Sequence, residues 1–309
     1  MDIIVIFLIA LLIDIAFSEP PNILHPVAWL GKLISLELKL KPSRGKLAQL
    51  IFGTAAVLMT TIIVTIPIYF VTNYLQSFHI ISSVLISALI LKYTFSIRGL
   101  SSAAKKVKKA ISNNNLTGAR SNLRALVSRD TSQLNKNQII AATVESIAEN
   151  SCDSIVAPFF YFAIFGLPGA VVYRIINTFD SMIGYHGEWE YIGKFAARID
   201  DIANFIPARI TALLISGLAW ICRCKSTCAW HIMIRDHNKT ESPNAGWTMS
   251  AAAGALDIQL EKTGHYILGD TNNTLTTNAI NKSVHILIAV TIVWSVISII
   301  IRMIYSAIA

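Results

Sequence analysis

The stretch LIFGTAAVLMTTIIVTIPIYFV at residues 50–71 has no charged side chain, and it decides the fold class of this chain. A helix needs about 20 mainly apolar residues to cross the hydrocarbon core of a bilayer. Residues 80–91 with their flanks and residues 284–309 are similarly apolar, and the last segment carries Arg302 as its one formal charge. The sequence therefore predicts three firm membrane-spanning helices.

Three further apolar segments carry polar or helix-breaking residues. Residues 3–17 contain Asp14, residues 155–172 contain Gly166 and Pro168, and residues 202–222 have a polar first half. Each segment either spans the membrane or packs inside the protein. The whole chain is 54% hydrophobic and 14% charged, against roughly 25% charged in soluble domains. We therefore expect an all-α polytopic membrane protein with about 4–6 membrane-embedded helices plus amphipathic cytoplasmic helices.

Residues 97–150 differ from the rest because charged residues alternate there with an apolar helical period. We expect an amphipathic cytoplasmic insertion at about these residues, inside a single integral-membrane domain covering residues 1–309. No β pattern of any length is visible.

The formal net charge is +8, and the Lys and Arg residues gather in alternate connections between the apolar segments. Such a bias predicts that the basic loops are cytoplasmic and that the protein lies in the cell membrane. Attraction to anionic lipid accounts for the remaining charge, and no nucleic-acid-binding motif accompanies it. The expected partner is therefore the lipid bilayer and not nucleic acid.

A ridge of carboxylates is predicted in AATVESIAENSCD at residues 141–153. On a helix, Glu145, Glu149 and Asp153 stand at positions i, i+4 and i+8. Like charges at this spacing repel, so the ridge favours a cation, an arginine or a polar ligand against it. The alternative is an ordinary solvated helix face.

Two more clusters place polar groups inside apolar runs. YRIINTFDSMIGYH at residues 173–186 contains Asn177, Asp180 and Ser181, and these groups either hold helices together or bind a ligand. His186 is a candidate only because these polar residues lie near it in the sequence. In ARIDDIANFIPARIT at residues 197–211, an internal Arg–Asp pair is the simpler interpretation, but ionisable groups beside membrane helices are candidates for a functional site.

Polar residues near the two ends of the chain are also candidates for a functional site. Asp14 and His25 flank a rigid, proline-containing turn after the first apolar run. The alternative to a functional role is that this turn is a hinge at the membrane surface. In SPNAGWTMSAAAGALDIQL at residues 242–260, helix capping explains Ser242 and Pro243 but not Asn244.

Five stretches together carry a more specific signal. They are LLIDIAFSEPPNILHPVAWLGKLI at residues 11–34, SRDTSQL at 128–134, VESIAENSCDSIVAPFFYFAIFGLPGAVVYRIINTFDSMIGY at 144–185, ARIDDIANFIPARIT at 197–211 and SPNAGWTMSAAAGALDIQL at 242–260. In this order they resemble the CobD/CbiB family of cobalamin biosynthesis, the adenosylcobinamide-phosphate synthases, over nearly the whole chain. One departure is Ser18-Glu19 where Gly-Asp is expected, which keeps the acid and lengthens it.

The resemblance implies an enzyme that joins a propionate carboxylate of adenosylcobyric acid to aminopropanol or its phosphate through an amide bond. ATP and Mg²⁺ are the expected cofactors, since an amide forms at neutral pH only from an activated carboxylate. The corrinoid and the amine are the expected substrates, and other proteins of the pathway are candidate partners. A non-catalytic corrinoid carrier or a scaffold is the alternative.

The residues expected to act follow from the same motifs. The catalytic candidates are Glu145, Glu149, Asp180, His186 and Asp201. The substrate-binding candidates are Asp14, His25, Arg129, Asp130, Asn150, Asn177, Ser181, Arg198, Asn204, Arg209, Ser242 and Asn244. Glu145, Glu149 and Asp153 are the hypothetical Mg²⁺ ligands.

One conflict arises if all six apolar segments cross the membrane. The clusters at residues 177–198 would then lie on the outer face, away from cytoplasmic ATP. We expect instead that residues 155–172 and 202–222 are broken or buried helices lining a cavity open to the cytoplasm.

Overall fold

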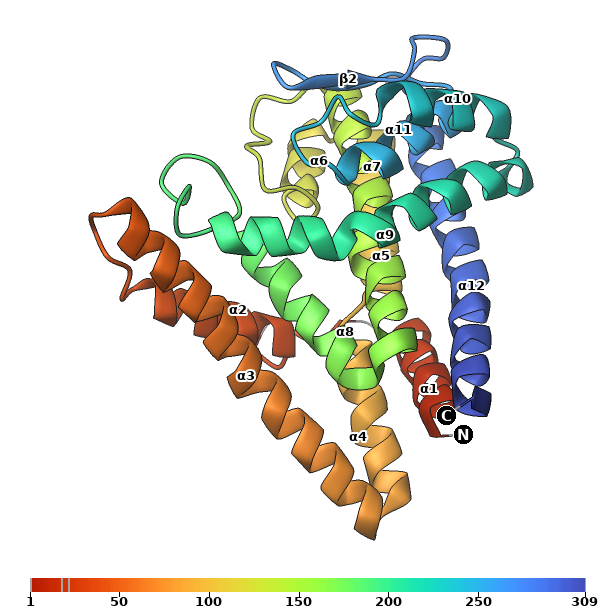
Figure 1. Cartoon of the computed structure of the whole chain (residues 1–309). Helices are drawn as coiled ribbons and strands as arrows, with labels where there is room; N and C mark the ends of the chain where they lie inside the picture. The colour runs from red at the N-terminus through yellow and green to blue at the C-terminus, as the bar shows by residue number, and fades with distance from the viewer. Residues whose placement is uncertain (1, 18, 22, 309) are drawn as a thin grey trace. The chain divides into compact units, whose positions relative to one another are not determined.

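The computed structural model describes residues 2–17, 19–21 and 23–308, so Ser18, half of the departure noted above, lies outside the described residues. The described chain is mainly helical (Figure 1). Five of its helices are long and apolar enough to cross a membrane, and they are Lys46–Phe78, Ile80–Ser112, Lys136–Ile183, Lys194–Cys222 and Thr277–Tyr305. The predicted all-α polytopic membrane fold is confirmed.

The chain divides into two compact units, which are described separately. Unit 1 comprises Met1–Ser96, Ala157–Ala203 and Ile297–Ala309, and unit 2 comprises Ile97–Val156 and Asn204–Val296. Unit 1 contains α1 (Asp2–Ala16), α2 (Pro26–Leu38), α3 (Lys46–Phe78), α4 (Ile80–Lys92), α8 (Ala157–Ile183), the first part of α9 (Lys194–Leu218) and the last part of α12 (Thr277–Ile308).

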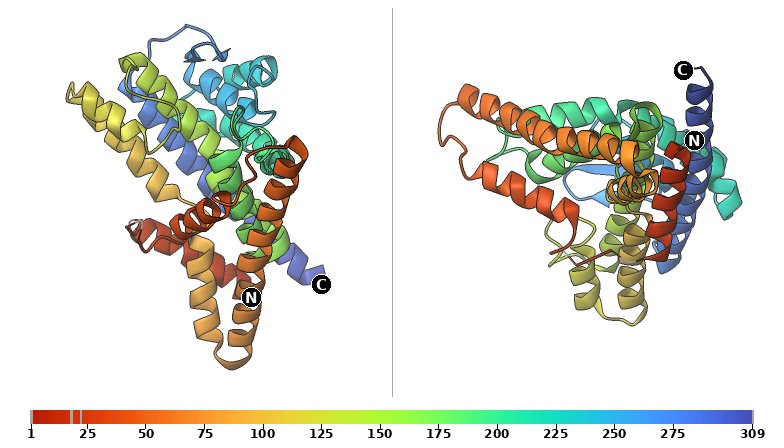
Figure 2. Two further views of the ribbon diagram at one scale, coloured as in Figure 1. Left: turned by 90° about the vertical axis from the view of Figure 1, so that its left-hand side faces the viewer. Right: turned by 90° about the horizontal axis from the view of Figure 1, so that it is seen from below.

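In unit 1, α3 and α4 form an antiparallel pair that turns at His79 (Figures 1 and 2). α1 packs on α4, and α3 packs on both α4 and α8. The rings of Phe7 and Phe95 each pack edge-on against Phe159, at 4.8 and 4.9 Å between centroids. This aromatic cluster joins α1, the end of α4 and α8 in one core.

The helix α8 reverses direction at Gly166, whose φ of 67° and ψ of −158° are open essentially to glycine alone. Residues twelve positions apart in a straight helix are separated by about 18 Å. The rings of Tyr161 and Tyr173 nevertheless stack at 5.2 Å, and a Cβ on Gly169 would lie 2.7 Å from the Tyr161 carbonyl oxygen. The two limbs therefore pack against each other next to the reversal and diverge away from it, as Figure 1 shows.

Both residues 155–172 and residues 202–222 were predicted to be broken or buried helices. The first segment is broken at Gly166, whereas the second is not broken. α9 continues through Pro207 to Leu218 and then tightens into a 3₁₀ turn, Ala219–Cys222. A proline costs one backbone hydrogen bond inside a helix, but packing on either side can sustain the helix across it.

Unit 2 contains α5 (Ile97–Ser112), α6 (Leu116–Leu123), α7 (Lys136–Ser151), a π-helical turn (Cys152–Val156), the rest of α9, α10 (Ser226–Asp236), α11 (Ala245–Leu256) and most of α12. α5 buries Leu100, Ala104, Val107 and Ile111 on one face and has lysines on the other. The predicted amphipathic helices are therefore present.

Helix α7 lies in the interior of unit 2, because every residue from Ile139 to Ala148 is buried. Its start is fixed by a capping box in which the side chains of Asn135 and Gln138 each accept from the other's backbone N–H. The same helix contacts α5, α6, α11 and β1 (Leu260–Lys262). Polar groups between Ile139 and Ala148 are therefore held away from bulk water.

Unit 2 also contains a β-hairpin that the sequence did not reveal. β1 pairs antiparallel with β2 (Tyr266–Leu268), with Leu260 opposite Leu268. Each strand has three residues, which is too short for a period-two pattern to be recognised.

Candidate functional site

In unit 1, the proline-containing turn after α1 is organised around the carboxylate of Glu19. It accepts hydrogen bonds from Lys92 Nζ at 2.6 Å, Ser96 Oγ at 2.9 Å and His25 Nε2 at 3.1 Å. Lys92 is 3% exposed and its Nζ also lies 3.8 Å from Asp14 Oδ1, which is itself buried. Two carboxylates of the predicted polar turn therefore share one buried ammonium group.

His25 has both a structural and an electrostatic role in this cluster. Its Nδ1 accepts the backbone N–H of Val27 at 3.2 Å and so caps α2, which leaves Nε2 to donate to Glu19. Burial opposes ionisation of Glu19, but the hydrogen bonds from His25, Lys92 and Ser96 outweigh it and lower the pKa of Glu19 to about 2. Glu19 is therefore ionised at every physiological pH.

A second acidic cluster in unit 1 joins α8 to α9. Asn177 Nδ2 donates to Asp200 Oδ1 at 3.4 Å, and Asp180 and Asp201 are close enough for their charges to repel. The hydroxyl of Ser181 bonds back to the carbonyl of Thr178 on its own helix. The structure thus brings together Asn177 and Asp180 from one predicted cluster and Asp201 from another.

His186 and Arg198 lie at the surface of unit 1. The side chain of His186 is 83% exposed and forms an ion pair with Glu190, four residues later. Arg198 is also exposed and acts electrostatically on Asp201. An exposed imidazole resembles a solvated loop residue more than a shielded base, so the role predicted for His186 gains no support from its position.

In unit 2, the ridge predicted on α7 is occupied by an arginine. Arg129 Nη2 donates to Glu145 Oε2 at 2.9 Å, and Glu145 is 5% exposed. Tyr266, on β2, lies close enough to Glu145 for the two groups to interact electrostatically, and its hydroxyl donates to Met249 Sδ at 3.7 Å. Burial and the charges of Glu145 and Glu149 raise the pKa of Tyr266 well above its usual range. The cluster thus holds a carboxylate, a guanidinium and a neutral phenol in a buried place.

The other candidates near this cluster have local roles. Asp130 is exposed, and its carboxylate accepts the backbone N–H and the hydroxyl of Ser132 in a turn. Asn150 bridges two turns of helix, since it donates to the Ser146 carbonyl and accepts from Ser154 Oγ.

The predicted three-carboxylate Mg²⁺ site is not preformed. Asp153 lies in the π-helical turn Cys152–Val156, where the regular i+4 spacing of the ridge ends. Within residues 2–17, 19–21 and 23–308, no three His, Cys, Asp or Glu side chains are grouped closely enough to hold a metal ion.

Two predicted motifs meet where α9 approaches α11 in unit 2. Arg209 Nη1 donates to Asn244 Oδ1 at 3.2 Å and to the Phe205 carbonyl at 2.6 Å. Its guanidinium lies 3.5 Å above the ring of Phe205 and 4.9 Å from that of Trp247, which stacks on His237 at 4.0 Å. Arg209 is thereby held between aromatic rings at the start of α11.

The other two unit 2 candidates are partly explained by structure. Ser242 Oγ accepts the backbone N–H groups of Asn244 and Ala245, so it caps the turn entering α11 from three residues before the helix begins. Asn204 is 2% exposed and accepts from Cys152 Sγ at 3.7 Å.

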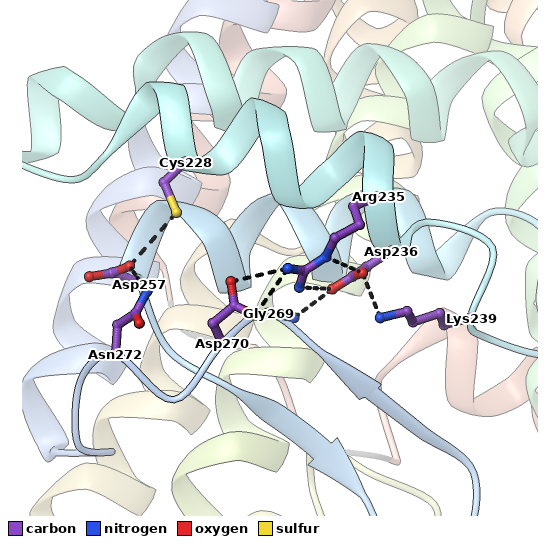
Figure 3. Close-up of polar contacts among 8 residues, drawn as sticks. All are labelled: Cys228, Arg235, Asp236, Lys239, Asp257, Gly269, Asp270 and Asn272. Carbon is purple, nitrogen blue, oxygen red and sulfur yellow. Dashed lines mark hydrogen bonds and ion pairs between the residues drawn. The ribbon is translucent and has the colours of Figure 1, made fainter.

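A network of charges fixes the hairpin that carries Tyr266 (Figure 3). Asp236 is fully buried, and it accepts from Arg235 Nε and Nη2, Lys239 Nζ and the backbone N–H of Gly269 at 2.6 to 2.8 Å. Burial opposes ionisation, but these donors lower the pKa of Asp236 to about 2. Arg235 also reaches Asp270 at 3.0 Å. The chain just after β2 is therefore tied to the end of α10.

Asp257 fixes the other side of the same loop from a left-handed position at the end of α11, with φ 57°. Its side chain accepts from Lys225, Asn272 and Asn273 at 2.6 to 2.9 Å and from Cys228 Sγ at 3.7 Å. The hydrogen bond from Lys225 is the main cause that lowers the pKa of Asp257. Two buried carboxylates thus hold the hairpin and the loop after it, in which β1 contacts α7 and β2 contacts α11.

Lys92, Glu19 and Tyr266 were not among the predicted site residues. Lys92 was counted with the basic connection that follows α4, although it is buried in unit 1. A single lysine directly after a long apolar run was the available signal. For Tyr266 no such signal existed, because the hairpin that carries it could not be recognised in the sequence.

These features define a multi-pass membrane protein with buried, paired ionisable groups in and beside its apolar helices. The chain belongs to the CobD/Cbib protein family, whose sequence model matches residues 7–299. It is 46% identical over 299 residues to the cobalamin biosynthesis protein CobD of Dehalococcoides mccartyi (strain CBDB1), covering 97% of each chain.

Two archaeal relatives are similar over a somewhat shorter length. Probable cobalamin biosynthesis proteins CobD of Methanothermobacter thermautotrophicus and Methanocaldococcus jannaschii are 41% and 40% identical, over 86% of this chain and 86% and 88% of theirs. No solved structure matches the chain. The family assignment places the protein in cobalamin biosynthesis.

Proposed function

We propose that this protein forms the amide bond between a propionate carboxylate of adenosylcobyric acid and the amine of aminopropanol or its phosphate. ATP would transfer a phosphoryl group to the propionate, and the amine would then displace phosphate from the acyl phosphate and release one proton. Membership of a cobalamin biosynthesis family supports the corrinoid substrate. The observation that carries the chemistry is the buried cluster of Arg129, Glu145 and Tyr266.

This cluster has the donors that carboxylate activation requires. The guanidinium of Arg129 is an always-charged, bidentate donor suited to a phosphate or a carboxylate. The Tyr266 phenol stays protonated because its pKa is raised, so it can donate a hydrogen bond to a developing negative charge. Arg129 now donates to Glu145 and the Tyr266 hydroxyl to Met249 Sδ, and an anionic substrate would compete with these acceptors for the two donors.

This site suits Mg²⁺ that arrives bound to ATP better than Mg²⁺ that is held by protein side chains alone. Nucleotide-bound Mg²⁺ usually needs only one or two carboxylates besides phosphates and water. Glu149 and Asp153 are the carboxylates of α7 and the π-helical turn that we propose for this role. Bound there, the ion would neutralise phosphate charge.

The acidic cluster of unit 1 suits the amine. Asp180 and Asp201 present two like charges with Asn177 beside them, which would attract an ammonium group. On this proposal, the hydrogen bond from Asn177 to Asp200 helps to hold α8 against α9 beside this pair.

The reversal of α8 supports a site on the cytoplasmic side. Because the limb after Gly166 runs back beside the limb before it, Asp180 returns toward the end at which α8 begins. That end follows the basic connection at residues 97–150 along the chain. We propose that both face the cytoplasm, in the cell membrane, where ATP is available.

The test uses the full chain, purified in detergent, with adenosylcobyric acid, aminopropanol phosphate, ATP and Mg²⁺. Mass spectrometry would detect the amide and a coupled assay the ADP. Tyr266→Phe and Glu149→Gln should each lower kcat by tenfold or more, while Glu261→Gln, the same change at an exposed position of β1, should not. Corrinoid binding without ADP or amide from the wild type would instead support the carrier.

A further inference from the structure

Unit 1 contains a cavity of about 440 Å³ that has no role in the proposed reaction. It is lined by the start of α1, the last turns of α3, the first turns of α4, the reversal of α8 and Arg302 near the end of α12. This volume is within the range of small-molecule sites.

The lining is polar in a way that apolar helices rarely are. Asn73 and Gln76 stand three residues apart on α3, and Arg302 is the one charged group among the described residues that line the cavity. Both amide side chains are exposed in the protein. Amides and an arginine at the surface of membrane helices are costly unless water, protein or a ligand satisfies them. The charge of the cavity favours an anion.

The position along the helices indicates the depth of the cavity. α3 has 33 residues, so it is about 50 Å long and exceeds a hydrocarbon core of about 30 Å. Asn73 and Gln76 lie in its last two turns, at the opposite end from Lys46. The exposed rings of Tyr74 and Tyr305 lie at the same helix ends, where aromatic side chains mark the interface with the headgroups.

The surroundings also offer apolar surface to a lipid tail. Phe70 on α3 and Ile81 on α4 are 65% and 73% exposed, one turn or less from residues that line the cavity. Arg302 has a long apolar stem and lies 5.0 Å from the ring of Tyr305, so its charged end can remain at headgroup depth.

We propose that this cavity binds the phosphate of an anionic phospholipid headgroup, with Arg302 as the ion-pairing group and Asn73 and Gln76 as hydrogen-bond donors. The acyl chains would lie along the exposed apolar faces of α3 and α4. The lipid would belong to the leaflet opposite the basic connection that precedes α3.

The test is native mass spectrometry of the full detergent-purified chain titrated with dioctanoyl phosphatidylglycerol. Parallel titrations use dioctanoyl phosphatidylcholine and inorganic phosphate. We expect saturable binding of one phosphatidylglycerol, weaker binding of phosphatidylcholine and no competition by millimolar phosphate. Arg302→Gln should raise the apparent Kd about tenfold, as expected for loss of one charged hydrogen bond, and Arg302→Lys should restore part of it.

Two further variants separate this site from general attraction to charge. Asn73→Leu removes one donor from an exposed position and should weaken binding several-fold without changing Tm. Arg44→Gln removes an exposed arginine from the other end of α3 and should leave binding unchanged. Equal losses in Arg44→Gln and Arg302→Gln, or no loss in either, would overturn the proposal. Equal competition by inorganic phosphate would show a phosphate site and not a lipid site.

Discussion

Replacing Lys92 by methionine should destabilise unit 1 more than any surface lysine change. The Lys92 ammonium group is 3% exposed and lies 2.6 Å from Glu19 and 3.8 Å from Asp14. Methionine fills the same volume but leaves two carboxylates without a cation. Asp14 is almost fully buried, so its charge cannot be solvated by water.

The expected loss can be worked out from this geometry. Breaking a buried ion pair by removing one partner costs about 3–5 kcal/mol. Glu19 is 27% exposed and keeps its bonds from Ser96 and His25, so the lower end, about 3 kcal/mol, applies. For a chain of this size that corresponds to a fall in Tm of roughly 6–10 °C.

The assay is thermal unfolding of the detergent-solubilised protein followed by tryptophan fluorescence. Lys32→Met, at an exposed position of α2, is the matched control and should change Tm by less than about 1 °C. Lys92→Met combined with Glu19→Gln should cost less than the sum of the two single changes, because both remove the same ion pair. Additive losses, or a Lys92→Met that behaves like Lys32→Met, would refute the shared-cation interpretation.

Three further outcomes are expected. Glu19 and Asp236 have pKa values lowered to about 2. The stability that their ionised forms contribute is therefore present above about pH 4.5 and should be lost as the pH falls from about 4.5 to 2. When Tm is measured against pH, Glu19→Gln should show a smaller fall over this range. Asp236→Asn weakens the bonds that hold the loop after β2, so amide exchange at Gly269 should accelerate at least tenfold by hydrogen exchange mass spectrometry, while α3 is unchanged. Gly166→Ala should cost about 1–3 kcal/mol because of the positive φ, whereas Gly217→Ala, a helical position with open space around its Cβ, should be neutral or slightly stabilising in the same unfolding assay.

The membrane helices could be predicted from the sequence because each follows from one property, a long apolar run. The reversal of α8 could be predicted in part, since Gly166 and Pro168 interrupt such a run. The direction of the chain after the break could not be, because it depends on the packing of Tyr161 on Tyr173. The continuation of α9 through Pro207 shows the opposite case, where tertiary packing sustains a helix that the local sequence would end.

The candidate site was predicted less completely because its partners are distant in sequence. Helical spacing placed Glu145 on a ridge, and like-charge repulsion predicted a cation against it. Arg129 is that cation. Tyr266, in contrast, belongs to a hairpin and lies 121 residues after Glu145 in the chain. Lys92 was wrongly predicted to be solvated for a related reason. Counting Lys and Arg residues per connection treats every lysine at the end of an apolar run as part of a solvated loop.

The composition of unit 1 has a consequence for how the protein is made. Its three segments are separated along the chain, and Ile297–Ala309 is synthesised after the other two. On the ribosome, α1, α3 and α4 enter the bilayer long before α8 is available to cover Phe7 and Phe95. The membrane-inserted part of unit 1 therefore remains incomplete until Ile297–Ala309 has been synthesised, and a premature stop before Ile297 would leave unit 1 without this segment.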